Sequence, residues 1–145
     1  MRALASLLVL AACWTDASPL PPPPPVLHPA SPLVPSLEAL PPAMTMAARA
    51  KFRLRWRVTN DGRETLDTKL AGSSNLLVNG APSNQWRASV GNGAVDPEWD
   101  ALRPGKTITR EYDIGEELFP APGDYTLVLV LEHATSRPLR VHVGP

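Results

Sequence analysis

From residue 52 to residue 58 the chain reads Phe-Arg-Leu-Arg-Trp-Arg-Val, an unbroken alternation of apolar and basic side chains. Successive side chains of a β-strand point to opposite faces of the sheet, so this period of two predicts a strand with one buried face. Asn60-Asp61-Gly62 follows closely and supplies a turn, because these residue types favour tight backbone reversals. The buried face includes Trp56, and the outer face carries three arginines: Arg53, Arg55 and Arg57.

Strand and turn signals recur at short intervals along the rest of the chain. Asn79-Gly80 is typical of a two-residue hairpin turn, Pro104-Gly105 of a type II turn, and Asp96-Pro97-Glu98-Trp99 of a single helical turn. Besides the first strand, we expect strands over residues 63–70, 75–78, 85–90, 107–113, 125–131 and 137–143. About seven short strands of this kind predict an all-β fold, a single antiparallel β-sandwich.

Three motifs set the order of these elements. Asn60-Asp61-Gly62 ends the first alternating strand, Leu102-x-Pro104-Gly105 precedes a later one, and Pro122-Gly123-x-Tyr125 precedes the most apolar one. This layout, over residues 50–143, resembles immunoglobulin-like and fibronectin-III-like domains of bacterial surface proteins. The same order resembles, more weakly, a bacterial proteinase-inhibitor domain family of this architecture, although the early Tyr-Asp-Phe segment of that family is absent from this sequence.

The N-terminus has the features of an export signal. Arg2 is followed by a largely apolar run over residues 3–12, which is long enough for a signal peptide and too short to span a bilayer. The run ends in Leu10-Ala11-Ala12-Cys13, which resembles the lipobox of bacterial lipoproteins. That resemblance implies cleavage before Cys13 and lipid attachment to its thiol. The alternative is an ordinary secretory signal that is cut after Ala17 and releases a soluble protein.

Cys13 is the only cysteine, so no internal disulfide competes with lipidation. The next residue is Trp14, where enterobacterial lipoproteins kept in the inner membrane often have aspartate. The resemblance therefore favours the outer membrane in a cell that has one, and we expect the protein to be exported and anchored by lipid to the cell envelope.

Prolines dominate the segment that follows the cysteine. Eleven of the 18 prolines lie between Pro19 and Pro42, and proline fixes φ and offers no N–H, which favours polyproline II. We expect a signal peptide over residues 1–12, an unfolded proline-rich linker over residues 13–48, and one folded domain over residues 49–145. Such a linker would act as a stalk that reaches roughly 90 Å when fully extended.

Composition and motifs argue against several kinds of chemistry. The chain holds 14 basic and 14 acidic residues, a balance that gives no reason to expect a nucleic-acid partner. The sequence contains neither G-x-S-x-G nor S-x-x-K, which carry serine nucleophiles. The histidines His28, His133 and His142 lack the spacing of zinc ligands. We therefore expect a protein that is not an enzyme and that uses no metal or cofactor.

Two groups of residues are candidates for binding a partner. Three guanidinium groups on one strand face, those of Arg53, Arg55 and Arg57, can grip phosphate or carboxylate, or they can pair with acids of neighbouring strands such as Asp67 or Glu111. Aromatic and polar residues in the predicted loops can form a patch at one end of the sandwich, or they can cap the core. The loop candidates are Asn79, Trp86, Asn92 and Trp99.

Taken together, the sequence predicts an envelope lipoprotein that presents a non-catalytic β-sandwich. We expect the domain to bind a protein or glycan partner or to have a structural role. The alternative is an inhibitor or immunity protein that acts on a periplasmic or extracellular enzyme such as a proteinase.

Overall fold

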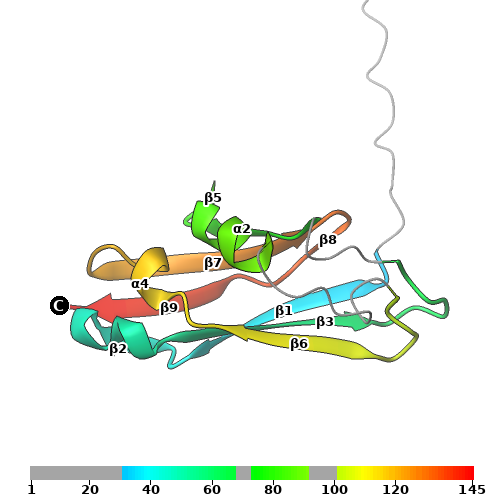
Figure 1. Ribbon diagram of the computed structural model, residues 1–145, viewed down its shortest axis with the longest axis horizontal. Helices are drawn as coiled ribbons and strands as arrows, with labels where there is room; N and C mark the ends of the chain where they lie inside the picture. Colours follow the sequence, from blue (N-terminus) through cyan, green and yellow to red (C-terminus); the bar gives the residue numbers. More distant parts are fainter. Residues whose placement is uncertain (1–30, 68–72, 92–100) are drawn as a thin grey trace, which may run out of the picture.

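The computed structural model describes residues 31–67, 73–91 and 101–145, and the strands within these ranges form two sheets that pack face to face (Figure 1). One sheet has three strands in the order β1-β3-β6. The other has six strands, five of them in the order β2-β9-β7-β4-β5, with β8 paired to β7. The predicted all-β sandwich is confirmed.

The bounds of the elements are as follows. The three-stranded sheet contains β1 (Leu33–Leu40), β3 (Arg53–Asn60) and β6 (Thr107–Tyr112). The six-stranded sheet contains β2 (Ala43–Thr45), β4 (Asn75–Val78), β5 (Ala81–Pro82), β7 (Gly123–Leu131), β8 (Ala134–Thr135) and β9 (Leu139–Gly144). The helices are the 3-10 helix η1 (Met46–Lys51) and the α-helices α2 (Asn84–Gly91) and α4 (Gly115–Leu118).

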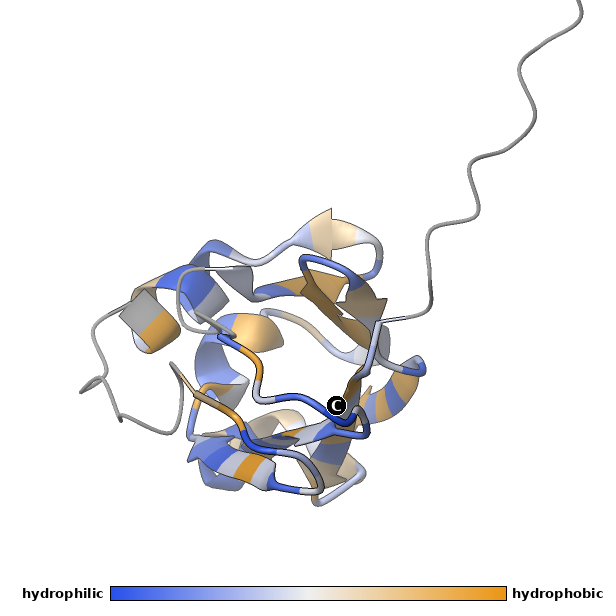
Figure 2. Cartoon of the chain, turned by 90° about the vertical axis from the view of Figure 1, so that its right-hand side faces the viewer, coloured by the Kyte–Doolittle hydropathy of each residue, from blue (hydrophilic) through white to orange (hydrophobic). Residues whose placement is uncertain are grey.

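The core lies between the sheets, and the alternating strand β3 supplies its centre. Leu54, Trp56 and Val58 are fully buried, and they face the buried side chains of β7 and β9 within one apolar cluster. Figure 2, which looks along the long axis, shows hydrophobic and hydrophilic residues alternating along the strands. Burial of such a face is the main contribution to stability. The predicted strand and its inward Trp56 are confirmed.

Two turns follow the chemistry of their residues. Asn79 and Gly80 have φ values of 50° and 83°, as a type I′ hairpin turn requires, and they join β4 to β5. At Pro104-Gly105, φ of the glycine is 69° and the N–H of Lys106 donates to the Arg103 carbonyl at 3.1 Å. Both predicted turns are confirmed.

Pro122-Gly123-x-Tyr125 makes a further corner before β7. The Tyr125 hydroxyl donates to the carbonyl of Ala121 at 2.7 Å, and its ring packs edge-on against Phe119 with centroids 4.8 Å apart. A tyrosine at the start of a strand whose hydroxyl bonds back to upstream backbone is the tyrosine corner of immunoglobulin-like sandwiches. The motif therefore has a structural function in this chain.

The predicted domain boundary at residue 49 is wrong, because residues 33–48 belong to the sandwich. β1 pairs antiparallel with β3 over all its residues, and β2 pairs in parallel with β9, so the sandwich is not purely antiparallel. The chain crosses from one sheet to the other at Pro41-Pro42, where the Leu40–Pro41 peptide bond is cis. A strand at a sheet edge can hold Pro35 because the missing N–H faces away from its partner.

A second prediction that the structure contradicts is the strand over residues 85–90. Trp86 and Val90, four residues apart, are both buried, which is the spacing of one helix face. The N–H of Trp86 donates to Ser83 Oγ at 3.2 Å, so this serine caps the helix α2. The short polar cap and the i, i+4 apolar pair favour a helix over a strand.

The strand expected over residues 63–70 is also not present in the part that the structure describes. Only Leu66 takes part in a bridge, with Leu102, while residues 68–70 lie outside the described ranges. The helical turn expected over residues 96–99 lies outside them too.

Candidate partner-binding surfaces

The three arginines of β3 form an ion-pair ladder across the outer face of the three-stranded sheet. Glu111 on β6 contacts Arg53 at 3.0 Å and Arg55 at 2.6 Å. Glu38 on β1 contacts Arg55 at 2.9 Å and Arg57 at 3.3 Å. Because β3 is the central strand, its arginines reach acids on both sides. The expected pairing with Glu111 is confirmed, whereas the other acid is Glu38 rather than Asp67.

The ladder holds its central charges in their ionised forms. The hydrogen bond from Arg55 is the main reason why the pKa of Glu111 lies below its usual value. The same contact, followed by the hydrogen bond to Glu38, raises the pKa of Arg55. Guanidinium groups whose donors are shared between two carboxylates are already engaged. The ladder therefore links three strands, and Arg53 and Arg57 at its ends are its more exposed cations.

The loop candidates do not gather into one patch within the described residues. Asn79 is a turn residue, and its side-chain oxygen accepts the N–H of Thr126 at 2.8 Å. Trp86 is fully buried and packs edge-on against Trp56, with centroids 5.9 Å apart. We therefore assign Trp86 to the core. Asn92 and Trp99 lie outside the described ranges.

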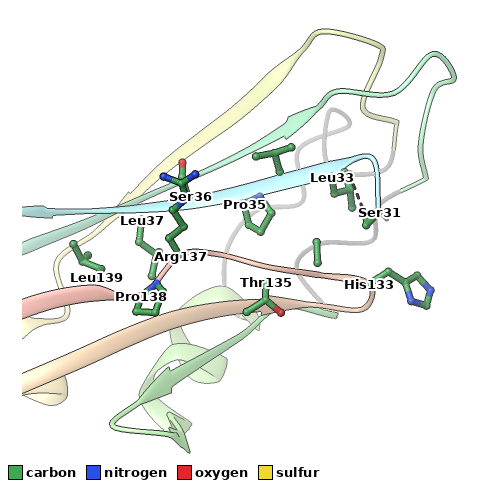
Figure 3. Close-up of a pocket in the computed structure, with 12 residues that line it drawn as sticks. Ser31, Leu33, Pro35, Ser36, Leu37, His133, Thr135, Arg137, Pro138 and Leu139 are labelled. Atoms are coloured by element: carbon green, nitrogen blue, oxygen red, sulfur yellow. Dashed lines mark hydrogen bonds between the residues drawn. The ribbon is translucent and has the colours of Figure 1, made fainter. Parts of the chain in front are cut away.

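A groove runs along the side of the sandwich between β1 and the segment that contains β8 and the start of β9 (Figure 3). It has a volume of about 760 Å³. Its β1 wall carries the partly or fully buried side chains of Leu33, Pro35 and Leu37. The opposite wall carries Thr135 and Arg137 among others. The sequence does not reveal this groove, because the prolines of residues 13–48 favour a linker there.

Among the strands that the structure describes, β1 pairs only with β3, so its other backbone edge faces this groove. The N–H of Asp61 donates to the Pro32 carbonyl at 2.8 Å, and the register pairs Leu33 with Asn60. Backbone groups of successive residues in a strand point to opposite sides. The even-numbered residues of β1 therefore bond to β3, and the odd-numbered ones face away from it. The N–H of Leu33 agrees with this pattern, since it donates to Ser31 Oγ at 3.2 Å.

The residues that the structure describes contain no group of three or more His, Cys, Asp or Glu side chains that could hold a metal ion. His142 pairs with Asp124 across β9 and β7, with Nδ1 and Oδ1 at 2.7 Å on the outer face. His133 lies beside Glu132 at the turn between β7 and β8. Over the described ranges, no helix is both long and apolar enough to cross a membrane.

Comparisons with known proteins add little beyond the topology. No protein-family model matches the chain, and no curated protein matches it either. The solution structure of the CARDB domain of the PF1109 protein from Pyrococcus furiosus is 14% identical and has a TM-score of 0.48, covering 78% of this chain and 94% of that domain. A crystal structure of the same domain in complex with di-metal ions is 14% identical with a TM-score of 0.46, covering 77% and 92%. Similarity at this level carries no inference about ligands of this chain.

Proposed function

We propose that this protein is a lipid-anchored envelope protein whose β-sandwich is a non-catalytic binding domain for a protein partner. The observation that supports this function best is the groove beside β1, in which a free strand edge borders a partly apolar cleft. Free edges of this kind are templates for pairing with another chain. The groove lies on the strand that directly follows the proposed tether.

The proposed anchor is the thiol of Cys13. The support is the position of Leu10-Ala11-Ala12-Cys13 at the end of the apolar run and the absence of any other cysteine from the chain. Since β1 begins at Leu33, the tether is shorter than residues 13–48. Residues 14–30 would reach roughly 50 Å as polyproline II. We propose that this segment holds the sandwich near the membrane surface.

Replacement of Cys13 tests the anchor. In cells we expect the signal peptide of Cys13→Ser to remain uncleaved, because the thiol that accepts the lipid is gone. For the same reason the variant should incorporate no labelled palmitate and should be absent from the lipid-modified protein. The matched control is Ala17→Leu, which removes the small residue needed for ordinary secretory cleavage but leaves the lipobox intact. Normal processing of Cys13→Ser together with blocked processing of Ala17→Leu would contradict the proposal and support a secreted soluble protein.

Cross-linking tests the binding domain. A photoreactive residue in place of exposed Thr135 at the groove should form a discrete adduct with one envelope protein. The same residue in place of exposed Arg103, which is not among the groove residues, serves as the control. Equal and diffuse labelling from both positions would contradict a specific partner at this surface.

A further inference from the structure

We propose that the free edge of β1 binds an extended acidic peptide segment of a partner protein by strand addition, with Arg137 pairing to a carboxylate of that segment. This inference rests on the proposed function and names the chemistry of the partner. Three observations carry it: the direction of the β1 backbone groups, the shape of the groove, and the charge on its walls.

The backbone of β1 defines which hydrogen bonds an added strand would make. The outward groups that border the groove are the N–H and carbonyl of Leu37 and the carbonyls of Leu33 and Pro35, whereas Ala39 is buried. Pro35 offers no N–H and the N–H of Leu33 already donates to Ser31 Oγ, so Leu37 supplies the donor of this edge and all three residues can supply acceptors. Within the described ranges β1 pairs only with β3, and β7, β8 and β9 lie beside it on the other sheet.

The groove adds recognition of side chains. Leu33 and Leu37 of β1 and Leu139 of β9 line it, and each packs against the core while remaining partly accessible. In strand addition, main-chain bonds supply affinity, and pockets that receive alternate side chains supply specificity. A segment with apolar residues at every second position would place them against these leucines.

The charge of the groove favours an acidic segment. Its lining contains one arginine, Arg137, and neither aspartate nor glutamate, and the lining residue His133 lies beside Glu132 at one end. Arg137 makes no ion pair with any residue that the structure describes, unlike Arg55 in the ladder. Figure 3 shows its side chain extending from the β8–β9 segment towards Ser36 on β1. A carboxylate at the mouth of the groove would complement this cation.

Two other occupants fit less well. Residues 19–29 of this chain contain seven prolines, which cannot donate to the β1 carbonyls. A second copy of the domain that paired edge to edge would bring two copies of Arg137 together in grooves without acids, and like charges oppose such pairing. The partner segment therefore comes from another protein.

The experiment uses the full chain in detergent micelles and a displayed library of random ten-residue peptides. We expect selected peptides to contain an aspartate or glutamate flanked by alternating apolar residues. A synthetic copy of the most enriched peptide should bind Arg137→Gln about fivefold more weakly than the unchanged protein, as expected for a rim charge. The matched control, Arg140→Gln, changes an exposed β9 arginine that does not line the groove and should leave affinity unchanged.

A second measurement isolates the backbone contribution. N-methylation of alternate amides in the selected peptide removes its donors on one edge, and the peptide methylated on the edge that faces β1 should no longer bind. Failure to enrich any peptide, peptides without acidic residues, or equal binding by both methylated forms would overturn the inference. The cross-linking result at Thr135 is independent of these outcomes. An adduct at Thr135 without peptide binding would contradict strand addition but would still agree with the proposed function.

Dimer formation would also overturn the inference. Analytical ultracentrifugation of the micelle-bound chain should give one copy at all concentrations used. A concentration-dependent dimer that Leu37→Pro abolishes would assign the β1 edge to self-association instead.

Discussion

Asn60 is the buried polar residue that joins the two halves of the chain. Its amide nitrogen donates to the carbonyls of Glu64 and Leu102, each at 2.8 Å, and its side-chain oxygen accepts the N–H of Gly62 at 2.9 Å. Asn60 itself is fully buried, so water cannot replace these partners. The side chain fixes the turn after β3 against the loop before β6.

Replacement of Asn60 by alanine should therefore be costly. We expect Asn60→Ala to lower the free energy of unfolding by about 2–4 kcal/mol, because several polar backbone groups would lose their partner in a buried site. Urea unfolding followed by tryptophan fluorescence measures the change. Thr59→Ala is the control, since the hydroxyl of Thr59 bonds to that of Thr107 in an exposed position. A loss of stability in Thr59→Ala as large as that in Asn60→Ala would contradict the explanation.

Also at the scale of single residues, the sequence predicted the burial of one tryptophan and did not decide that of another. Trp56 shares a strict alternation with charged neighbours, so its burial followed from the pattern alone. Trp86 has only Val90 as a periodic partner, and the helix that buries it is eight residues long. A pair of apolar residues at one spacing is too little to decide between a helix and a strand.

Strands with an uninterrupted pattern of apolar residues were predicted from the sequence. Strands whose apolar pattern is interrupted were not. β3, β6 and β7 follow predicted segments closely. β1 alternates Leu33, Pro35, Leu37 and Ala39 towards the core, but Pro35 and the prolines that flank the strand hid this period. The acid partners of the arginines depend on which strands lie beside β3. That pairing is a tertiary property, so Glu38 could not be selected from the sequence.

The ladder predicts a dependence of stability on pH. The pKa of Glu111 is lowered in the folded state, mainly by the hydrogen bond from Arg55. A carboxyl group with a lowered folded pKa stabilises the fold at pH values above its unfolded pKa, and the contribution is lost as the pH falls through the folded pKa. We expect Glu111→Gln to be slightly less stable than the unchanged protein at pH 7 and equally stable at pH 2.

Urea unfolding of both proteins at several pH values between 2 and 7 provides the measurement. Glu116→Gln is the control, because Glu116 is an exposed acid for which no salt bridge is seen among the described residues. A difference between Glu111→Gln and the unchanged protein that persists at the lowest pH would show that the glutamine acts through packing rather than through charge.

At the scale of the whole molecule, the main correction concerns where the domain begins. β1 forms one edge of the three-stranded sheet and β2 forms one edge of the six-stranded sheet, so the same short segment closes both. Without it, β3 and β9 would lose a neighbour, and buried residues such as Ala39 and Met44 would be missing from the core.

Two truncated forms test this boundary. We expect residues 31–145 to unfold in one cooperative transition, because both sheets are complete. We expect residues 49–145 to lack such a transition and to bind hydrophobic dyes, because the apolar faces of β3 and β9 would be uncovered. Circular dichroism during heating and dye fluorescence distinguish the two forms. If both truncated forms unfold in equally cooperative transitions, the folded domain would begin at residue 49.

The position of β1 also has a mechanical consequence. The chain enters the sandwich at the start of β1, at one end of the long axis, and β9 ends at the other (Figure 1). The hydrogen bonds between β1 and β3 lie across the strand direction, so tension applied at residue 31 along this axis acts on all of them in shear. A domain held by its N-terminus and pulled at its far end would therefore resist with the whole ladder from Leu33 to Leu40, rather than unzip one bond at a time.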